Sequence, residues 1–351
     1  MPAYRPGKNA SQAEEQHDIS NAIKLASNEV PWGPIPSVVD KIADAAAGIN
    51  RYPDHRATVL RERLAEWISG EIGQAVETDC VTVGAGSSGI LQQLALTYVD
   101  PGDEVLYPWR SFESYPIYTK LVDGVEVTVP LKDERHDLEG LAAALTSRTK
   151  LCILSNPNNP TGTAVPMSVI GQFLDGVPNE TIMVLDEAYK EFMSPGVGDS
   201  LTDLIPHHEN LIVLRTFSKA HGLAGLRVGY AVGNPSIIES IDKTLVPFAV
   251  NALAQTAAIA SIDAHAEVQE RVEFIVGERN RVAAELGEAG WVVPEPEANF
   301  IYLPLGARAD EVYLDLEKKG VVTRAFSGEG VRVTIGSSEE NDRFLRALLG
   351  H

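Results

Sequence analysis

Seven short apolar runs separated by helical stretches constrain the fold of this chain more than any other feature. Stretches such as GILQQLALTYV, residues 89–99, have the composition of connecting helices. Runs that are apolar on both faces are typical of parallel strands covered by helices on both sides. We therefore predict an α/β domain with a mostly parallel sheet. The runs, between residues 80 and 235, are CVTVGAG, DEVLYP, VEVTVPL, KLCILSNP, TIMVLDEAY, LIVLRTF and VGYAVGNP.

The pattern changes near residue 246. A long helical region, roughly 252–290, precedes WVVPEPEANFIYLPL, a helix near 309–319 and the short run GVRVTIG. Helices mixed with short strands indicate a smaller α+β domain. The first residues are polar and contain proline, which favours an arm over a packed element. We predict an N-terminal arm over 1–25, a large domain over 26–246 and a small domain over 247–351.

The charge balance limits the classes of partner. With 29 basic and 49 acidic residues the net charge is −20, which opposes binding to nucleic acid or to an anionic membrane. An anionic ligand therefore needs a local positive site.

Neither the two cysteines, Cys80 and Cys152, nor the His207–His208 pair has metal-ligand spacing, so we predict no metal site. Without a signal peptide or an apolar stretch of about 20 residues, the expected location is cytoplasmic.

A glycine-rich turn follows the first of these strands. VTVGAGSSGILQQL has glycines at 84, 86 and 89 between a strand and a helix, which is the spacing of a dinucleotide-binding loop. A dinucleotide site also needs an acidic residue at the end of the next strand, but EVLYPW ends in Tyr107, Pro108 and Trp109. The helix N-terminus and the hydroxyls of Ser87 and Ser88 still form an anion site. A phosphate fits it better than the dinucleotide of an NAD-dependent dehydrogenase.

Polar residues follow three further strands. Asn159 lies in the turn after KLCILS, Asp186 ends IMVLD, and Lys219 follows LIVLRTF. Ligands of parallel sheets bind beyond the carboxyl ends of the strands. These side chains are therefore expected to face one crevice.

Taken together, SNPNNPTG, LDEAY and TFSKAHGLAGLRVGY resemble the pyridoxal phosphate (PLP) aminotransferases of fold type I, in the histidinol-phosphate aminotransferase group. The resemblance extends from IKLASNE to the C-terminus. Within this group IKLASNE, YPWRSFESYP, LVPFAVNALAQ and EENDRFLRAL are most similar to the aromatic amino acid aminotransferase branch. The resemblance implies PLP as cofactor and reversible amino transfer between an aromatic amino acid and 2-oxoglutarate.

The resemblance also implies a role for each matching residue. Lys219 would form the Schiff base with PLP, and Asp186 would pair with its pyridine nitrogen. Asn159 and Tyr189 would bond its phenolic oxygen, and Phe112 would stack on its ring. The remaining implied contacts are to the phosphate, from Ser87, Ser88, Thr216, Ser218 and Arg227, and from Tyr52 of a neighbouring subunit, which implies a homodimer.

Substrate recognition is expected in the small domain. In VRVTIG the period of a strand separates Arg332 and Thr334 from the apolar residues between them, so Arg332 can face the cleft. It matches the family arginine that binds the substrate α-carboxylate, and Asn28 is a weaker match to the same site. Tyr4 or Trp32 would pack against the aromatic side chain of the substrate.

Two alternatives remain open. A histidinol-phosphate aminotransferase would share the chemistry but needs extra cations for a dianionic substrate, for which Arg110 and Arg324 are the candidates. A non-catalytic PLP-binding module attached to a DNA-binding domain is disfavoured by the short arm and the charge. The chain also departs from the family, which often has an acidic residue at Ser87 or Ser88 and an aromatic residue at His221. We interpret both departures as variation near the phosphate.

Overall fold

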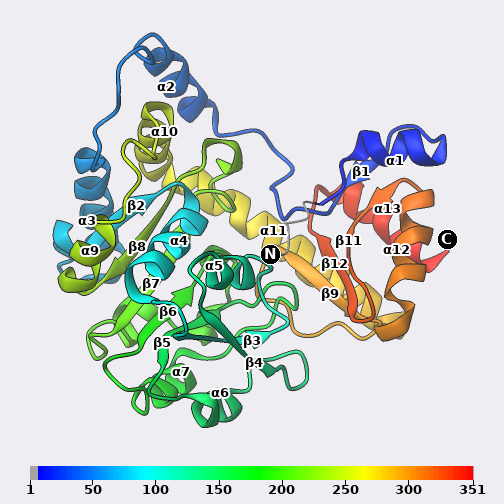
Figure 1. Cartoon of the computed structure of the whole chain (residues 1–351). Helices are drawn as coiled ribbons and strands as arrows, with labels where there is room; N and C mark the ends of the chain where they lie inside the picture. The colour runs from blue at the N-terminus through cyan, green and yellow to red at the C-terminus, as the bar shows by residue number, and fades with distance from the viewer. Residues whose placement is uncertain (1–6, 351) are drawn as a thin grey trace.

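A large lobe and a smaller lobe make up the computed structural model, which describes residues 7–350 (Figure 1). The large lobe contains a seven-stranded sheet in the order β2-β8-β7-β6-β5-β3-β4. Each of the seven apolar runs coincides with one of its strands to within a residue or two at either end, apart from the loop residues quoted after some strands, so this prediction is confirmed. The strands are β2 (Val81–Gly84), β3 (Glu104–Trp109), β4 (Val125–Pro130), β5 (Thr149–Ser155), β6 (Ile182–Asp186), β7 (Leu211–Thr216) and β8 (Gly229–Gly233).

The sheet is mostly parallel. Strands β3 to β7 pair in parallel, whereas β8 is antiparallel to both β7 and β2. In this register Ser155 at the end of β5 lies opposite Asp186 at the end of β6. The carboxyl ends of β5, β6 and β7 therefore share one edge of the sheet, as expected for a parallel sheet.

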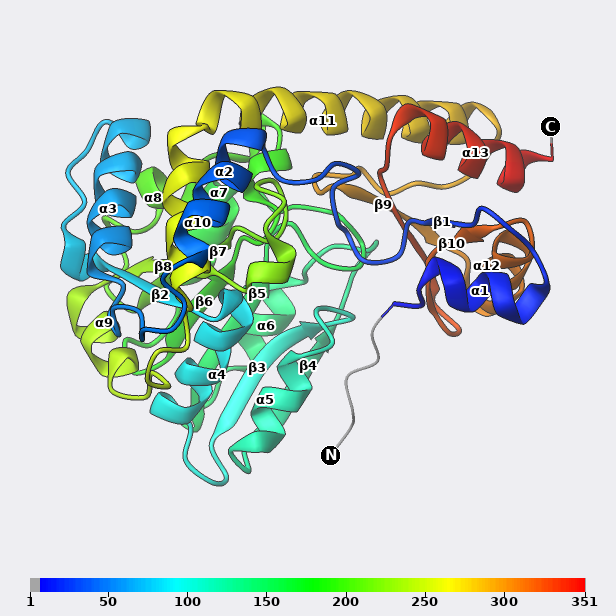
Figure 2. The ribbon, with the colours of Figure 1, turned by 90° about the horizontal axis from the view of Figure 1, so that it is seen from above.

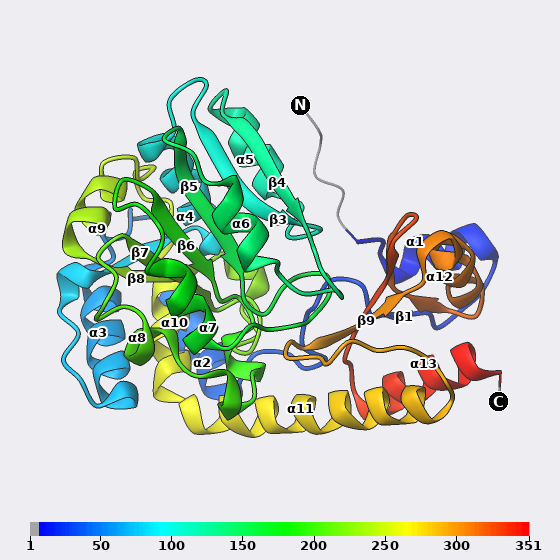
Figure 3. The same ribbon diagram turned by 90° about the horizontal axis from the view of Figure 1, so that it is seen from below.

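Successive strand residues pack into two different layers. Val184 and Ile212 contribute to one apolar cluster, and their neighbours Met183 and Val213 contribute to the other. Burying each such side chain stabilises the fold by about 1.5–3 kcal/mol. The first layer includes α4 (Gly86–Tyr98), α5 (Tyr115–Leu121) and α9 (Pro235–Asp242). The second layer, seen from below in Figure 3, includes α2 (Pro36–Ala46), α3 (Thr58–Ile72), α6 (Leu138–Ala144), α7 (Met167–Leu174), α8 (Ser200–Asp203) and α10 (Ala252–Asp263).

The small lobe is built on a three-stranded antiparallel sheet with the order β11-β12-β9. The long helix α11 (His265–Glu288) runs along both lobes (Figure 2). A capping box between Ser337 and Glu340 starts the last helix. The elements are β9 (Phe300–Pro304), α12 (Ala309–Lys318), β11 (Arg324–Phe326), β12 (Gly330–Thr334), α13 (Ser338–Leu349) and the parallel pair β1 (Ile23–Lys24) with β10 (Val321–Val322).

The N-terminal segment is packed on the small lobe, in contrast to the unpacked arm that we expected. Helix α1 (Ala10–His17) packs on the small lobe, and Ala13 is fully buried beside Ala26 and Val322. The Gln12 side chain accepts a hydrogen bond from the Asn9 N–H at 2.9 Å, which is half of a capping box. The polar composition of this segment does not reveal the capping contact of α1 or the small apolar face around Ala13.

Between residues 7 and 350, no helix combines the length and apolarity that crossing a bilayer requires.

Candidate active site

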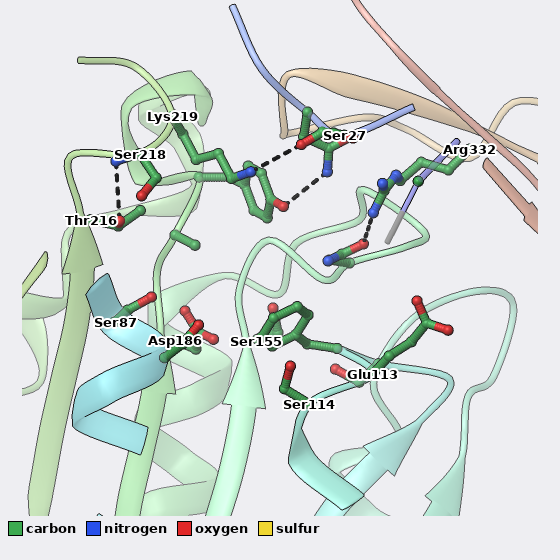
Figure 4. Close-up of a pocket in the computed structure, with 18 of the residues that line it drawn as sticks. Ser27, Ser87, Glu113, Ser114, Ser155, Asp186, Thr216, Ser218, Lys219 and Arg332 are labelled. Atoms are coloured by element: carbon green, nitrogen blue, oxygen red, sulfur yellow. Dashed lines mark hydrogen bonds between the residues drawn. The ribbon is translucent and has the colours of Figure 1, made fainter. Parts of the chain in front are cut away.

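A cavity of about 490 Å³ lies at the carboxyl ends of the strands and is lined by residues from both lobes (Figure 4). Every residue that we assigned to the cofactor or to the α-carboxylate of the substrate, except Tyr52, lines it. These residues are Asn28, Ser87, Ser88, Phe112, Asn159, Asp186, Tyr189, Thr216, Ser218, Lys219, Arg227 and Arg332.

Lys219 lies just beyond β7 and extends toward the small-lobe side of the cavity. Its Nζ donates to the Ser27 carbonyl at 3.2 Å and lies 5.7 Å from the centre of the Tyr189 ring. Burial, reinforced by the charges of Arg332 and Arg227, lowers the pKa of Lys219 to about 7. A substantial fraction of the amine is therefore neutral near pH 7, which is the form that attacks a carbonyl.

Asp186 is a buried carboxylate facing the same cavity. The Tyr115 hydroxyl donates to its Oδ2 at 2.9 Å, whereas its buried Oδ1 has no hydrogen-bond partner among the described residues. Burial raises the pKa of Asp186 to about 6. An unpartnered buried carboxylate oxygen is costly, so this site is suited to a ligand that donates a hydrogen bond or carries positive charge.

An anion-binding subsite lies at the start of α4. Ser87 and Ser88 are in its first turn, where backbone N–H groups and the helix dipole favour negative charge. The Arg227 guanidinium reaches this turn and donates to Ser218 Oγ at 3.2 Å. A Cβ on Gly86, whose φ is +74°, would lie 2.6 Å from Arg227 Nη2. Glycine at this position thus lets the arginine approach the helix.

The loop after β5 places Asn159 in the cavity. Asn156 exchanges two hydrogen bonds with the Val165 backbone, at 2.7 and 3.0 Å. Asn158 receives a hydrogen bond from Ser111 and donates one to the Arg110 carbonyl. These hydrogen bonds hold the loop in a tight turn. The same turn places Asn159 in the cavity.

Arg332 reaches the cavity from β12 in the small lobe. Its Nη1 donates to Asn159 Oδ1 at 2.5 Å and its Nη2 to the Ala26 carbonyl at 2.7 Å. The alternation predicted for this strand is observed, because Val331 and Val333 pack in the core. Asn28 lies beside this site and donates to the Tyr189 hydroxyl at 2.9 Å. A guanidinium in this position can bind a carboxylate through two parallel hydrogen bonds.

Two expectations about neighbouring residues differ from the structure. His221 does not lie at the anion subsite, because it packs on Phe217 and bonds Ser261 Oγ at 2.7 Å. Burial lowers the pKa of His221 to about 3, so it is a neutral core residue. Trp32 packs against Phe274, with ring centres 5.1 Å apart, and is not among the cavity-lining residues. Tyr4 lies outside the described residues.

Tyr52 lies apart from this cavity. Its side chain is 82% exposed and stacks on Phe248, with ring centres 4.5 Å apart. Its predicted contact with the site of a neighbouring subunit stays a prediction.

Sequence reasoning missed several cavity residues. Ser155 ends β5 directly opposite Asp186, so the rule that selects Asp186 could also have found it. Glu113 lines the cavity, whereas Tyr115 lies outside its lining and bonds Asp186. Both residues lie in YPWRSFESYP, a stretch from which we inferred only a family resemblance. Phe326, from β11, gave no chemical signal in the sequence.

Known proteins are similar to this chain in both sequence and fold. The family described as Aminotransferase class I and II matches residues 20–348. The aromatic amino acid aminotransferase of Thermobifida fusca (strain YX) is 49% identical over 98% of this chain and 93% of its own length. That of Corynebacterium glutamicum (strain R) is 46% identical over 99% and 96%. A crystal structure of histidinol-phosphate aminotransferase from Sinorhizobium meliloti in complex with pyridoxal-5'-phosphate gives a TM-score of 0.89 at 29% identity, over 99% and 95% of the two chains.

The sequence match spans nearly the whole chain, and the solved structure has the same two-lobed fold over almost all of its length. The chain therefore belongs to the class I and II aminotransferases.

Proposed function

We propose that this protein is a PLP-dependent aromatic amino acid aminotransferase that moves the amino group between phenylalanine, tyrosine or tryptophan and 2-oxoglutarate. One observation carries the proposal. A lysine with a lowered pKa, a buried carboxylate with an unpartnered oxygen and a strand arginine all line one cavity. The names of the relatives at 46–49% identity support the aromatic substrate class.

The residues of the cavity fit PLP. The unpartnered Asp186 Oδ1 suits a protonated ring nitrogen, and the α4 turn with Arg227 suits a phosphate. Phe112 lines the cavity and could pack on the ring, while Asn159 and Tyr189 offer polar atoms for the phenolic oxygen. When bound, PLP takes up the substrate amino group and delocalises the electrons left when Cα loses its proton.

Each protein group then has a definite task. Lys219 binds the cofactor in the resting enzyme and, once displaced by substrate, its amine carries the proton away from Cα. The Asp186 carboxylate keeps the ring nitrogen protonated. Arg332 holds the substrate α-carboxylate and thereby orients Cα toward Lys219.

The homodimer belongs to this proposal. Tyr52 and Phe248 form an exposed aromatic pair beside Val246, which is 63% exposed. Such a surface favours burial against a second copy, from which Tyr52 would reach the partner's phosphate. A cytoplasmic location and a role in amino acid biosynthesis are likewise predictions.

Steady-state kinetics test the proposed substrate class. Phenylpyruvate, with glutamate as amino donor, should be turned over at least ten times more efficiently than histidinol phosphate is with 2-oxoglutarate. The reverse preference would identify the protein as a histidinol-phosphate aminotransferase instead. That alternative has the support of a structural relative bearing this name.

Borohydride reduction tests the lysine independently. It should fix the cofactor covalently to the wild-type chain and to the control Lys41→Ala, altered on the exposed face of helix α2, but not to Lys219→Ala. Covalent cofactor on Lys219→Ala would mean that another lysine carries it.

A further inference from the structure

Two neighbouring arginines stand on the small-lobe wall of the cavity. Arg324 on β11 and Arg332 on β12 are direct cross-strand partners, and both line the cavity. Side chains of directly opposed residues in an antiparallel pair lie on the same face of the sheet. A substrate group bound by Arg332 is therefore also within the electrostatic reach of Arg324.

Arg324 is paired with a carboxylate from the other lobe. Its Nη2 donates to Glu113 Oε2 at 2.7 Å. Glu113 precedes α5 in the large lobe and lines the same cavity, on the side where Figure 4 shows Arg332 and away from Asp186. The Glu113 side chain is 34% exposed, so the pair borders the opening of the cavity.

The two candidate substrates differ at the position that Arg332 binds. An aromatic amino acid carries a singly charged carboxylate on Cα. Histidinol phosphate carries a phosphate ester there, which is bulkier, extends farther from Cα and approaches two negative charges near pH 7. One guanidinium can pair with a carboxylate, whereas a dianion in a partly buried site needs a second cation.

We propose that Glu113 is a specificity-determining residue that selects α-carboxylate substrates over phosphate esters by neutralising Arg324 beside Arg332. This inference rests on the proposed function and explains how a site with two adjacent arginines can favour aromatic amino acids. A phosphate beside Arg332 faces the Glu113 carboxylate, and juxtaposed like charges oppose binding strongly. The selection is thus made against the wrong substrate as well as for the right one.

A second ion pair between the lobes supplies a matched control. Arg110 binds Glu329 through two hydrogen bonds, at 2.6 and 2.7 Å, and neither residue is among those lining the cavity. If Glu113 acted only by joining the lobes, Glu329→Gln should have the same consequences as Glu113→Gln. If it acts by charge beside the substrate, the two variants should differ.

The experiment measures kcat/KM of the holoenzyme for phenylalanine and for histidinol phosphate, both with 2-oxoglutarate. In Glu113→Gln the ratio of histidinol phosphate to phenylalanine efficiency should rise at least about tenfold. It should stay within about twofold of wild type in Glu329→Gln and in the charge-conserving Glu113→Asp. The double variant Glu113→Gln/Arg324→Gln should lose the gain, because Arg324 is the cation that Glu113 neutralises.

Each outcome has a distinct meaning. A ratio in Glu113→Gln within twofold of wild type, or an equal rise in Glu329→Gln, overturns the role of Glu113 while leaving the aromatic assignment intact. A wild-type enzyme that already prefers histidinol phosphate overturns the proposed function itself. If Glu113→Gln does not fold, Glu113→Ala replaces it with the same expectation and the same refuting result.

Discussion

The lowered pKa of Lys219 makes the stability of the cofactor-free protein depend on pH in a way that one substitution should remove. The ordinary pKa of a lysine is 10.5, and in the folded protein that of Lys219 is about 7. Between these values the unfolded chain binds the Lys219 proton more tightly than the folded protein does, so this group destabilises the fold. The cost is absent above pH 10.5 and grows as the pH falls toward 7.

The magnitude follows from these two pKa values. The cost is at most about 4 kcal/mol at pH 7 and about 2 kcal/mol at pH 9. Lys219→Met keeps the length of the side chain and removes the charge. The stability difference between Lys219→Met and wild type should therefore shrink by up to about 2 kcal/mol from pH 7 to pH 9.

Urea unfolding of the cofactor-free proteins at several pH values measures this difference. One fixed protein concentration is needed, since the unfolding of the proposed homodimer would depend on concentration. Lys41→Met, on the exposed surface of α2, is the control and should differ from wild type by less than about 0.5 kcal/mol throughout. A Lys219→Met difference that does not change between pH 7 and pH 9 would refute the argument that burial and Arg332 shift the pKa of this amine.

Three further substitutions test the remaining roles. Asp186→Asn should retain cofactor but lower kcat on the order of a hundredfold or more, with little change in KM, because the carboxylate acts mainly in the transition state; an unchanged kcat would contradict its role. Arg332→Ala should cost roughly 2–5 kcal/mol in kcat/KM for phenylalanine, tyrosine and glutamate alike, since all share the α-carboxylate, and a loss confined to one substrate would argue otherwise. Tyr52→Phe should weaken cofactor retention on the order of tenfold in equilibrium dialysis. Sedimentation showing a monomer at working concentrations would exclude donation of Tyr52 by a neighbouring subunit.

Sequence patterns predicted the sheet well because the information is local. Every strand of the large lobe except the edge strand β4 is a mostly apolar run that is buried on both faces. Such a run has few other possible structures. The carboxyl-end rule likewise predicted that Asn159, Asp186 and Lys219 share one cavity. The antiparallel direction of β8 lay beyond such reasoning, because a short apolar run does not encode the direction of its neighbour.

The contacts that refine the site are the least predictable part. Tyr115 bonds Asp186 and Glu113 bonds Arg324 across 71 and 211 positions of sequence. The first contact depends on how α5 packs on the sheet, and the second depends on how the two lobes are placed relative to each other. The resemblance supplied cofactor contacts residue by residue, but it gave no role to Glu113.

Main-chain carbonyls of the β1–α2 connection contact two of the cationic side chains that line the cavity, Arg332 and Lys219. The Ala26 carbonyl accepts from Arg332 and the Ser27 carbonyl from Lys219, only a few residues after β1 pairs with β10. Every residue type has a main-chain carbonyl, so substitutions at Ala26 and Ser27 should be tolerated. Insertions and deletions should not be tolerated there. A change of one residue between Lys24 and Asn28 would either shift the β1–β10 register or move both carbonyls out of hydrogen-bonding distance of Lys219 and Arg332. In a comparison of related sequences, the residue types in this segment should therefore vary, whereas its length should not.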